Sequence, residues 1–134
     1  MRSRRRGSSR SSSRYLPDRV PAGNEWGERI GYSRAVRAGD LIEVAGTTAP
    51  GDSAYDQARA ALAVIETALQ ELGASTRDVV RTRMFVVDIA ANADEVGRAH
   101  WEVFGDIKPA TAMYGVTGLL RSGMLVEIEA TARR

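Results

Sequence analysis

Two carboxylates lie on one face of the apolar segment that closes the chain. Residues 124–130 alternate as a strand does, which places Glu127 and Glu129 on one face and apolar side chains on the other. A partly buried carboxylate has its pKa raised toward neutrality and can direct water to a C=N or C=O carbon. Alternatively, Glu127 forms a structural ion pair with Arg81 or Arg83, which share a face of another predicted strand. The sequence leaves both interpretations open.

Few other side chains have types suited to catalysis. Lys108 is the single lysine, so a Schiff-base mechanism would have to use it, although a surface loop is the simpler interpretation. His100, the single histidine, falls on the apolar stripe of a predicted helix, as expected for a half-buried structural residue. The absence of cysteine excludes a thiolate nucleophile and a disulfide, and one histidine excludes multi-histidine zinc sites. No phosphate-binding glycine-rich loop follows a strand. We therefore expect no metal and no cofactor.

Length and composition are those of one globular domain. The chain has 134 residues, of which 43% are hydrophobic and 27% charged. Its longest apolar runs fall well short of the ~20 residues that cross a bilayer, so we expect a cytoplasmic protein without a membrane segment. The net charge of +2 hides an asymmetry, because residues 1–14 contain six arginines and no acidic residue, whereas residues 15–134 carry 13 basic and 17 acidic groups.

The Arg/Ser-rich segment 1–14 is expected to be a disordered tail, or the result of a start codon assigned too far upstream. It lacks the apolar region of a secretory signal and the apolar face of a transit peptide. Without interleaved aromatic residues, nucleic-acid binding through its arginines would be weak and non-specific. Residues 15–28, with two prolines and two glycines, are expected to form an irregular lead-in to a single domain at 29–134.

The first half of this domain predicts a hairpin followed by a helix. Residues 30–37 and 41–47 are extended runs around a glycine turn. Asp52 or Ser53 can cap the helix that follows, and Gly73 ends it. One apolar stripe runs along this helix: Ala58, Ala61, Leu62, Ile65, Ala68, Leu69 and Leu72.

The second half predicts a strand, a helix and two further strands. Residues 79–88 are a valine-rich strand, and Asn92 with Glu95 forms a capping-box pattern at the start of a helix. Gly105 ends that helix, whose stripe is Val96, Ala99, His100, Val103 and Phe104. Strands at about 112–118 and 123–132 complete the order β-β-α-β-α-β-β. This order predicts an α+β fold in which two helices pack on one face of a single mixed sheet.

The sheet face away from the helices requires an explanation. It should carry Arg81, Arg83, Glu127 and Glu129 among apolar side chains, which is too apolar for a solvent face and too charged for a monomer core. Packing against copies of the same chain would solve both problems. We therefore predict a homo-oligomer with Arg83 and Glu127 near the seam.

Several segments together resemble the Rid family, also called YjgF or L-PSP. The similarity spans residues 30–132 in order and spacing. Its segments are GYSRAV (31–36), VAG (44–46), YDQARAALAVIETALQELGAS (55–75), DVVRTRMFVVDI (78–89), GRAHWEVFGDIKPAT (97–111) and VEIEA (126–130). The resemblance implies a chorismate-mutase-like α+β fold and a homotrimer with small-molecule sites in clefts between subunits. The deaminases of this family hydrolyse imines or enamines, such as 2-aminoacrylate, to keto acids.

The resemblance also implies site residues. Glu127 would be catalytic, and Tyr32 and Gly46 would line the cleft. The family's substrate-clamping arginine, in a Pro-Ala-Arg motif, is Thr111 here, which places the chain in an Arg-less branch. Three further positions depart from the family: its Ser is Ala45, its Asn is Gly97 and a small residue is Met113. Arg83 is the candidate substitute for the missing clamp.

Three functions follow as alternatives. The first is an enzyme acting on an imine, enamine or related carbonyl metabolite, with Glu127 positioning water. The second is a catalytically silent protein that binds a metabolite in the same clefts. The third is an RNA-acting protein, which would depend on the tail because the acidic body repels phosphate.

Overall fold

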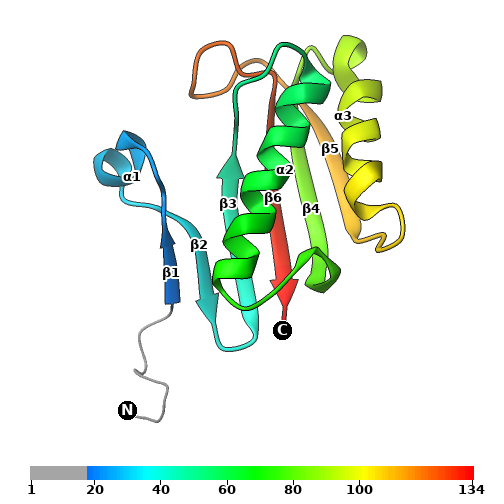
Figure 1. Ribbon diagram of the computed structural model, residues 1–134. Coiled ribbons are helices and arrows are strands. Elements are labelled where there is room, and N and C mark those ends of the chain that lie inside the picture. Colours follow the sequence, from blue (N-terminus) through cyan, green and yellow to red (C-terminus); the bar gives the residue numbers. More distant parts are fainter. Residues whose placement is uncertain (1–17) are drawn as a thin grey trace.

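The computed structural model describes residues 18–134, so the predicted tail and residues 15–17 lie outside it. The described chain forms six strands, three α-helices and one 3-10 turn (Figure 1). In chain order the elements are β1 (Asp18–Pro21), α1 (Glu25–Ile30), β2 (Ser33–Ala38), β3 (Leu41–Thr47), α2 (Ala54–Glu71), η1 (Thr76–Asp78), β4 (Val79–Val87), α3 (Ile89–Phe104), β5 (Ala110–Val116) and β6 (Val126–Arg133).

One mixed sheet organises these elements, in the order β1-β2-β3-β6-β4-β5. The pairing of β4 with β5 is parallel, and the other neighbours are antiparallel. Helices α2 and α3 cover one face, with α2 over β3 and β6 and α3 beside β4 and β5 (Figure 1). The predicted α+β fold, with two helices on one face of a mixed sheet, is confirmed.

The core lies between α2, α3 and this sheet face. The entire predicted stripe of α2 is buried, and the Ser53 hydroxyl caps the helix by accepting from the Asp56 amide at 3.1 Å. From the sheet, alternate residues such as Ile42, Val86 and Ile128 enter the same core and are fully buried. The opposite residues of each strand therefore point to the face without helices, which we call the open face.

Residues 15–28 differ from the expected irregular lead-in. Within the described part, β1 pairs with β2 and α1 begins at the cap residue Asn24, whose side chain accepts from the Trp26 amide at 2.9 Å. Helix α1 buries none of its residues and ends at Gly31, in the left-handed conformation (φ 79°). A six-residue helix held by its caps leaves no apolar period to detect.

The start of α3 also differs from expectation. The helix begins at Ile89, after Asp88 in a left-handed conformation (φ 52°), and not at an Asn92–Glu95 capping box. The Asn92 amide instead donates to the carbonyl of Val87 at 2.8 Å, and Glu95 accepts from the backbone amide of Tyr55 at 3.0 Å. Both side chains therefore stabilise tertiary contacts of α3 with its neighbours.

Candidate functional site

Glu127 lies at the centre of the open face, on β6. Its strand neighbour on β4 is Phe85, and its side chain lies against the bulge of β3 between Val44 and Thr47. Gly46 occupies this bulge, and a Cβ added there would meet the Glu127 Oε2 at 2.4 Å and its Cδ at 2.8 Å. The Glu127 carboxylate therefore lies directly against the Gly46 backbone, and any larger residue at position 46 would displace it.

The environment of Glu127 favours the protonated form. Desolvation by burial raises the pKa of this carboxyl, and the nearby charge of Glu129 raises it further. The guanidinium of Arg34 acts in the opposite direction and lowers the same pKa. A half-buried carboxyl with a raised pKa and a cation in its neighbourhood is suited to exchange protons with a bound water.

Arg34 is a buried cation that the sequence did not single out. Its side chain is 7% exposed and donates to the Gly46 carbonyl and the Thr47 hydroxyl, both at 2.8 Å. It also donates to the hydroxyl of Tyr32 at 3.1 Å. The signal for it was present, because Arg34 and Tyr32 are two apart and so share a strand side, next to the predicted Val44-Ala45-Gly46 segment. What could not be read was the bulge that supplies its acceptors.

Tyr32 is held from two directions. Its hydroxyl accepts from Arg34 and exchanges hydrogen bonds with the side chain of Asn24, at 3.1 Å and 3.2 Å. Asn24 is at the same time the cap of α1, so this short helix and the phenol are fixed by one residue. The unpredicted lead-in therefore positions a predicted site residue.

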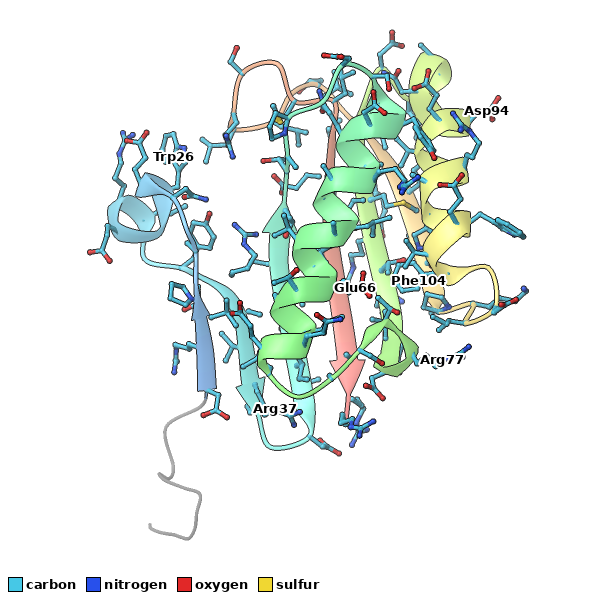
Figure 2. All side chains as sticks on the ribbon, viewed as in Figure 1. Trp26, Arg37, Glu66, Arg77, Asp94 and Phe104 are labelled. Carbon is cyan, nitrogen blue, oxygen red and sulfur yellow. The ribbon has the colours of Figure 1, made fainter. Side chains whose placement is uncertain are left out.

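These residues line one pocket of about 420 Å³. Its walls come from α1, β2, the bulge of β3 and the loop between β5 and β6, and Figure 2 labels Trp26 on the α1 side. The pocket brings together four of the predicted site residues, Tyr32, Ala45, Gly46 and Glu127. It also contains two arginines, Arg34 and Arg121. The other lining residues are Asn24, Trp26, Ile30, Thr48, Gly118, Leu119 and Leu120.

Arg83 lies outside this pocket. The strand register places it opposite Glu129, and its guanidinium forms an ion pair with that carboxylate at 3.6 Å. Both partners are between one third and two fifths exposed. They line a neighbouring shallow basin of about 690 Å³ on the open face, which Tyr32 and Ala45 also border. The ion pair considered for Glu127 is thus made by Glu129, and the arginines nearest Glu127's pocket are Arg34 and Arg121.

The three remaining predicted residues, Gly97, Thr111 and Met113, belong to α3 and β5. Thr111 pairs in register with Thr82 of β4, whose fully buried side chain belongs to the helix-covered face. Gly97 lines a pocket of about 290 Å³ between α3 and the start of β5, which we call the α3–β5 pocket. Helices α1 and α3 lie at opposite sides of the molecule (Figure 1). Within a single chain, the predicted site residues therefore fall into two separate groups, one around Glu127 and one on α3 and β5.

Other features limit the kinds of site in residues 18–134. No group of three or more acidic or histidine side chains there could hold a metal ion. None of the helices in the described part of the chain is long and apolar enough to cross a membrane. The Glu127 pocket and the α3–β5 pocket each combine hydrogen-bonding groups with apolar walls.

The fold is that of the YjgF-like α+β class: one mixed sheet with two helices packed on one face. Within this class the chain belongs to the endoribonuclease L-PSP family, whose model matches residues 24–134. The resemblance seen in the sequence is thereby confirmed.

Three relatives illustrate the family. A crystal structure from Mycobacterium tuberculosis, described as a member of the YjgF/YER057c/UK114 family, is 50% identical with a TM-score of 0.85, covering 88% of this chain and 99% of the other. An uncharacterized protein of Streptomyces coelicolor is 39% identical over 123 residues, covering 87% of this chain and 91% of the relative. A RutC family protein of Pyrococcus abyssi is more distant, at 32% identity over 75% of this chain and 84% of its own length.

Proposed function

We propose that this protein is a Rid-type hydrolase of a reactive imine, enamine or related carbonyl metabolite. Glu127 is its catalytic group, and Tyr32, Arg34, Ala45 and Gly46 shape the pocket around it. The observation that carries the proposal is the half-buried carboxyl of Glu127, whose pKa is raised by burial, held against Gly46 inside a pocket of ligand size.

The proposed reaction uses one water. The Glu127 carboxylate accepts a proton from the water as the water oxygen adds to the C=N carbon, and the imine nitrogen takes up a proton from solvent, which gives a carbinolamine. The protonated Glu127 then gives its proton to the nitrogen and accepts the hydroxyl proton as the C–N bond breaks, which leaves a carbonyl compound and ammonia or an amine. Glu127 finally releases that proton to solvent. A raised pKa helps both halves, because the group must accept and release a proton near neutral pH.

We further propose that the complete site forms between subunits of a homotrimer. In that arrangement the Glu127 pocket of one subunit faces the α3–β5 edge of the next, where Gly97, Thr111 and Met113 lie. Two observations support this: β5 is an edge strand, and large apolar side chains near it are exposed, with Trp101 at 69% and Tyr114 at 43%. Light scattering should give about three times the 14.5 kDa chain mass.

A mixing experiment tests the shared site directly. Glu127→Gln should abolish hydrolysis of an imine panel, and Thr111→Trp should block the other half of the site. Neither variant alone should turn over substrate. After the two are mixed and reassembled at equal amounts, about one quarter of the interfaces should combine two native halves and regain activity. No recovery, with trimers of mixed composition confirmed by mass spectrometry, would contradict a shared site.

A catalytically silent binding protein is the second candidate. Thr111 favours it, since a threonine hydroxyl cannot supply the paired charged donors of a guanidinium. Ligands that raise the melting temperature of the wild type without turnover would support this candidate. Thr111→Arg separates the two cases, because gain of hydrolysis of α-imino acids would indicate a hydrolase scaffold adapted to other ligands.

A role on RNA would rest on residues 1–14, outside the described part of the chain. The remaining domain has four more acidic than basic groups, which disfavours phosphate contacts. Deletion of residues 1–14 should therefore remove any RNA binding that the full chain has.

A further inference from the structure

A chain of hydrogen bonds links the α3–β5 pocket to the interior of the protein. His100 Nε2 lies 2.8 Å from the Thr82 hydroxyl, which lies 2.8 Å from the Thr111 hydroxyl. The Thr111 hydroxyl in turn lies 3.0 Å from the carbonyl of Pro109, to which it donates. Thr82 is fully buried and His100 half-buried, with the imidazole packed on the ring of Phe104 at a centroid distance of 4.7 Å.

The carbonyl at one end determines the direction of the whole chain. A carbonyl oxygen can only accept, and a hydroxyl has one proton, so the Thr111 proton is used on Pro109. Thr82 must then donate to Thr111, which uses its single proton as well. His100 is left as the donor to Thr82, and its Nε2 carries a proton. In the neutral ring, Nδ1 is therefore the unprotonated nitrogen.

This direction decides what Thr111 can offer to a ligand. Its proton is donated and one lone pair receives the Thr82 proton, which leaves one lone pair as an acceptor. The side chain is exposed at the edge strand and donates to Pro109, which lines the α3–β5 pocket. A Cβ added at Gly97, which lines the same pocket, would meet nothing within 4 Å, so the pocket has room for a ligand. A carboxylate brings acceptors only and would face another acceptor here.

We infer that the Thr111 hydroxyl, exposed beside the α3–β5 pocket, selects an uncharged ligand group with a hydrogen-bond donor, such as the N–H of a carboxamide or the O–H of an alcohol. Thr111 is the acceptor that reads this group, and Thr82 and His100 are positioning residues that hold the hydroxyl in its acceptor orientation. The inference rests on the proposed function for the reaction, and it names the substrate class: imines or carbonyl compounds whose second polar group is neutral.

Lys108 is the alternative that must be tested, because it is the cation that lines this pocket. Its ammonium donates to the carbonyl of Gly105 at the end of α3. A ligand carboxylate bound by Lys108 would overturn the inference. Lys108→Met is the variant for this point, and it should leave the discrimination between ligands unchanged.

The first experiment reads the direction of the chain without any ligand. His100 is the single histidine, so one long-range ¹H–¹⁵N spectrum at neutral pH assigns its tautomer without ambiguity. We expect a protonated Nε2 and an unprotonated Nδ1. The opposite tautomer would make Thr82 donate to His100 and Thr111 donate to Thr82, with no proton left for Pro109, and would overturn the inference. Thr82→Val should abolish the preference for this tautomer.

The second experiment compares ligand pairs that differ in one group, carboxamide against carboxylate. The wild type should favour the carboxamide by about tenfold in kcat/KM or in affinity from thermal shifts, the size of one hydrogen bond gained and one repulsion avoided. Thr111→Val should bring the ratio close to one, while Thr111→Ser should retain it. His100→Gln, which can still donate from its amide, should retain more of the ratio than His100→Phe.

Failure of the proposed reaction is distinguishable from failure of this inference. Glu127→Gln should lower turnover of both ligands equally and leave their ratio unchanged. If no imine is hydrolysed at all, the affinity ratio still measures the selectivity of the pocket. A wild type that binds the carboxylate as well as the carboxamide would overturn the inference in either case.

Discussion

Gly46→Ala tests whether the bulge of β3 holds the carboxylate of Glu127 in place. The added Cβ would lie 2.4 Å from Oε2, 2.8 Å from Cδ and 3.2 Å from Cγ of Glu127. Gly46 does not have the left-handed backbone that would itself oppose alanine. The steric conflict with Glu127 therefore dominates the effect of this substitution.

The expected magnitude follows from the distances. An ordinary contact begins near 3.4 Å, so the carboxylate must retreat by about 1 Å. Overpacking a core costs about 1–3 kcal/mol, and we expect about 1–2 kcal/mol because the atoms in conflict belong to the end of a flexible side chain. A catalytic group misplaced by about 1 Å loses about 100-fold in rate, so activity should suffer more than stability.

Urea unfolding at one fixed protein concentration measures the stability effect, and imine hydrolysis measures the rate. In a Glu127→Ala background, Gly46→Ala should become nearly neutral, because the conflicting atoms are gone. Gly97→Ala is the matched glycine control for stability, since its Cβ would meet nothing within 4 Å inside α3, and it should stabilise by about 0.4–1 kcal/mol. Equal destabilisation by Gly46→Ala in both backgrounds would refute the reasoning.

Three further predictions concern charges. Burial raises the pKa of Glu127 in the folded state, so wild-type stability falls as pH rises above about 4.5, the pKa of this group in the unfolded chain. Glu127→Gln should therefore stabilise the protein at pH 7 and not below about pH 4.5. Unfolding midpoints at pH 4 and pH 7 check this. His100 shows the converse, because burial lowers its pKa in the folded state. Wild-type stability should therefore be complete above about pH 6.5 and fall at lower pH, where the unfolded chain binds the proton more readily. In His100→Phe, this fall in stability at low pH should be absent. Arg37 donates to the carbonyls of Leu72, Gly39 and Arg134, so Arg37→Met should lower the free energy of unfolding in urea by about 2 kcal/mol. As the control, Arg59→Met removes an exposed ion pair with Glu102 and should have little effect.

The fold could be predicted wherever an apolar period repeats over several turns or strands. The stripe of α2 and the alternation of β6 each bury one complete set of side chains, and both are present as expected. The start of α3 was misplaced, because Asn92 and Glu95 match a capping pattern while their actual partners, Val87 and Tyr55, come from other elements. A local pattern cannot distinguish a cap from a tertiary contact made by the same side chains.

For the candidate site, the sequence indicates the strand and face of single residues but not the contacts between them. Alternation along β6 was sufficient to place Glu127 and Glu129 on the open face. Which of them meets Arg83 depends on the register between β4 and β6, and a shift of two residues exchanges the partners without changing any face. Arg34 depends on the bulge of β3, which has no signature beyond Gly46 itself.

The open face supplies the strongest physical reason for an assembly. Phe85 stacks on Tyr114 at 5.4 Å, the Arg83–Glu129 pair lies nearby, and no helix of the described chain covers them. Arg81 adds a buried Nε that has no hydrogen-bond partner within residues 18–134, a cost that an acceptor from a neighbouring subunit would remove. If subunits associate through this face, Arg81→Met should weaken the assembly less than Arg81→Ala, because methionine retains the packing of the stem and loses only a guanidinium that the interface must satisfy. Dissociation measured by dilution in light scattering checks this order, and equal weakening by both variants would place Arg81 in a charge contact across the interface.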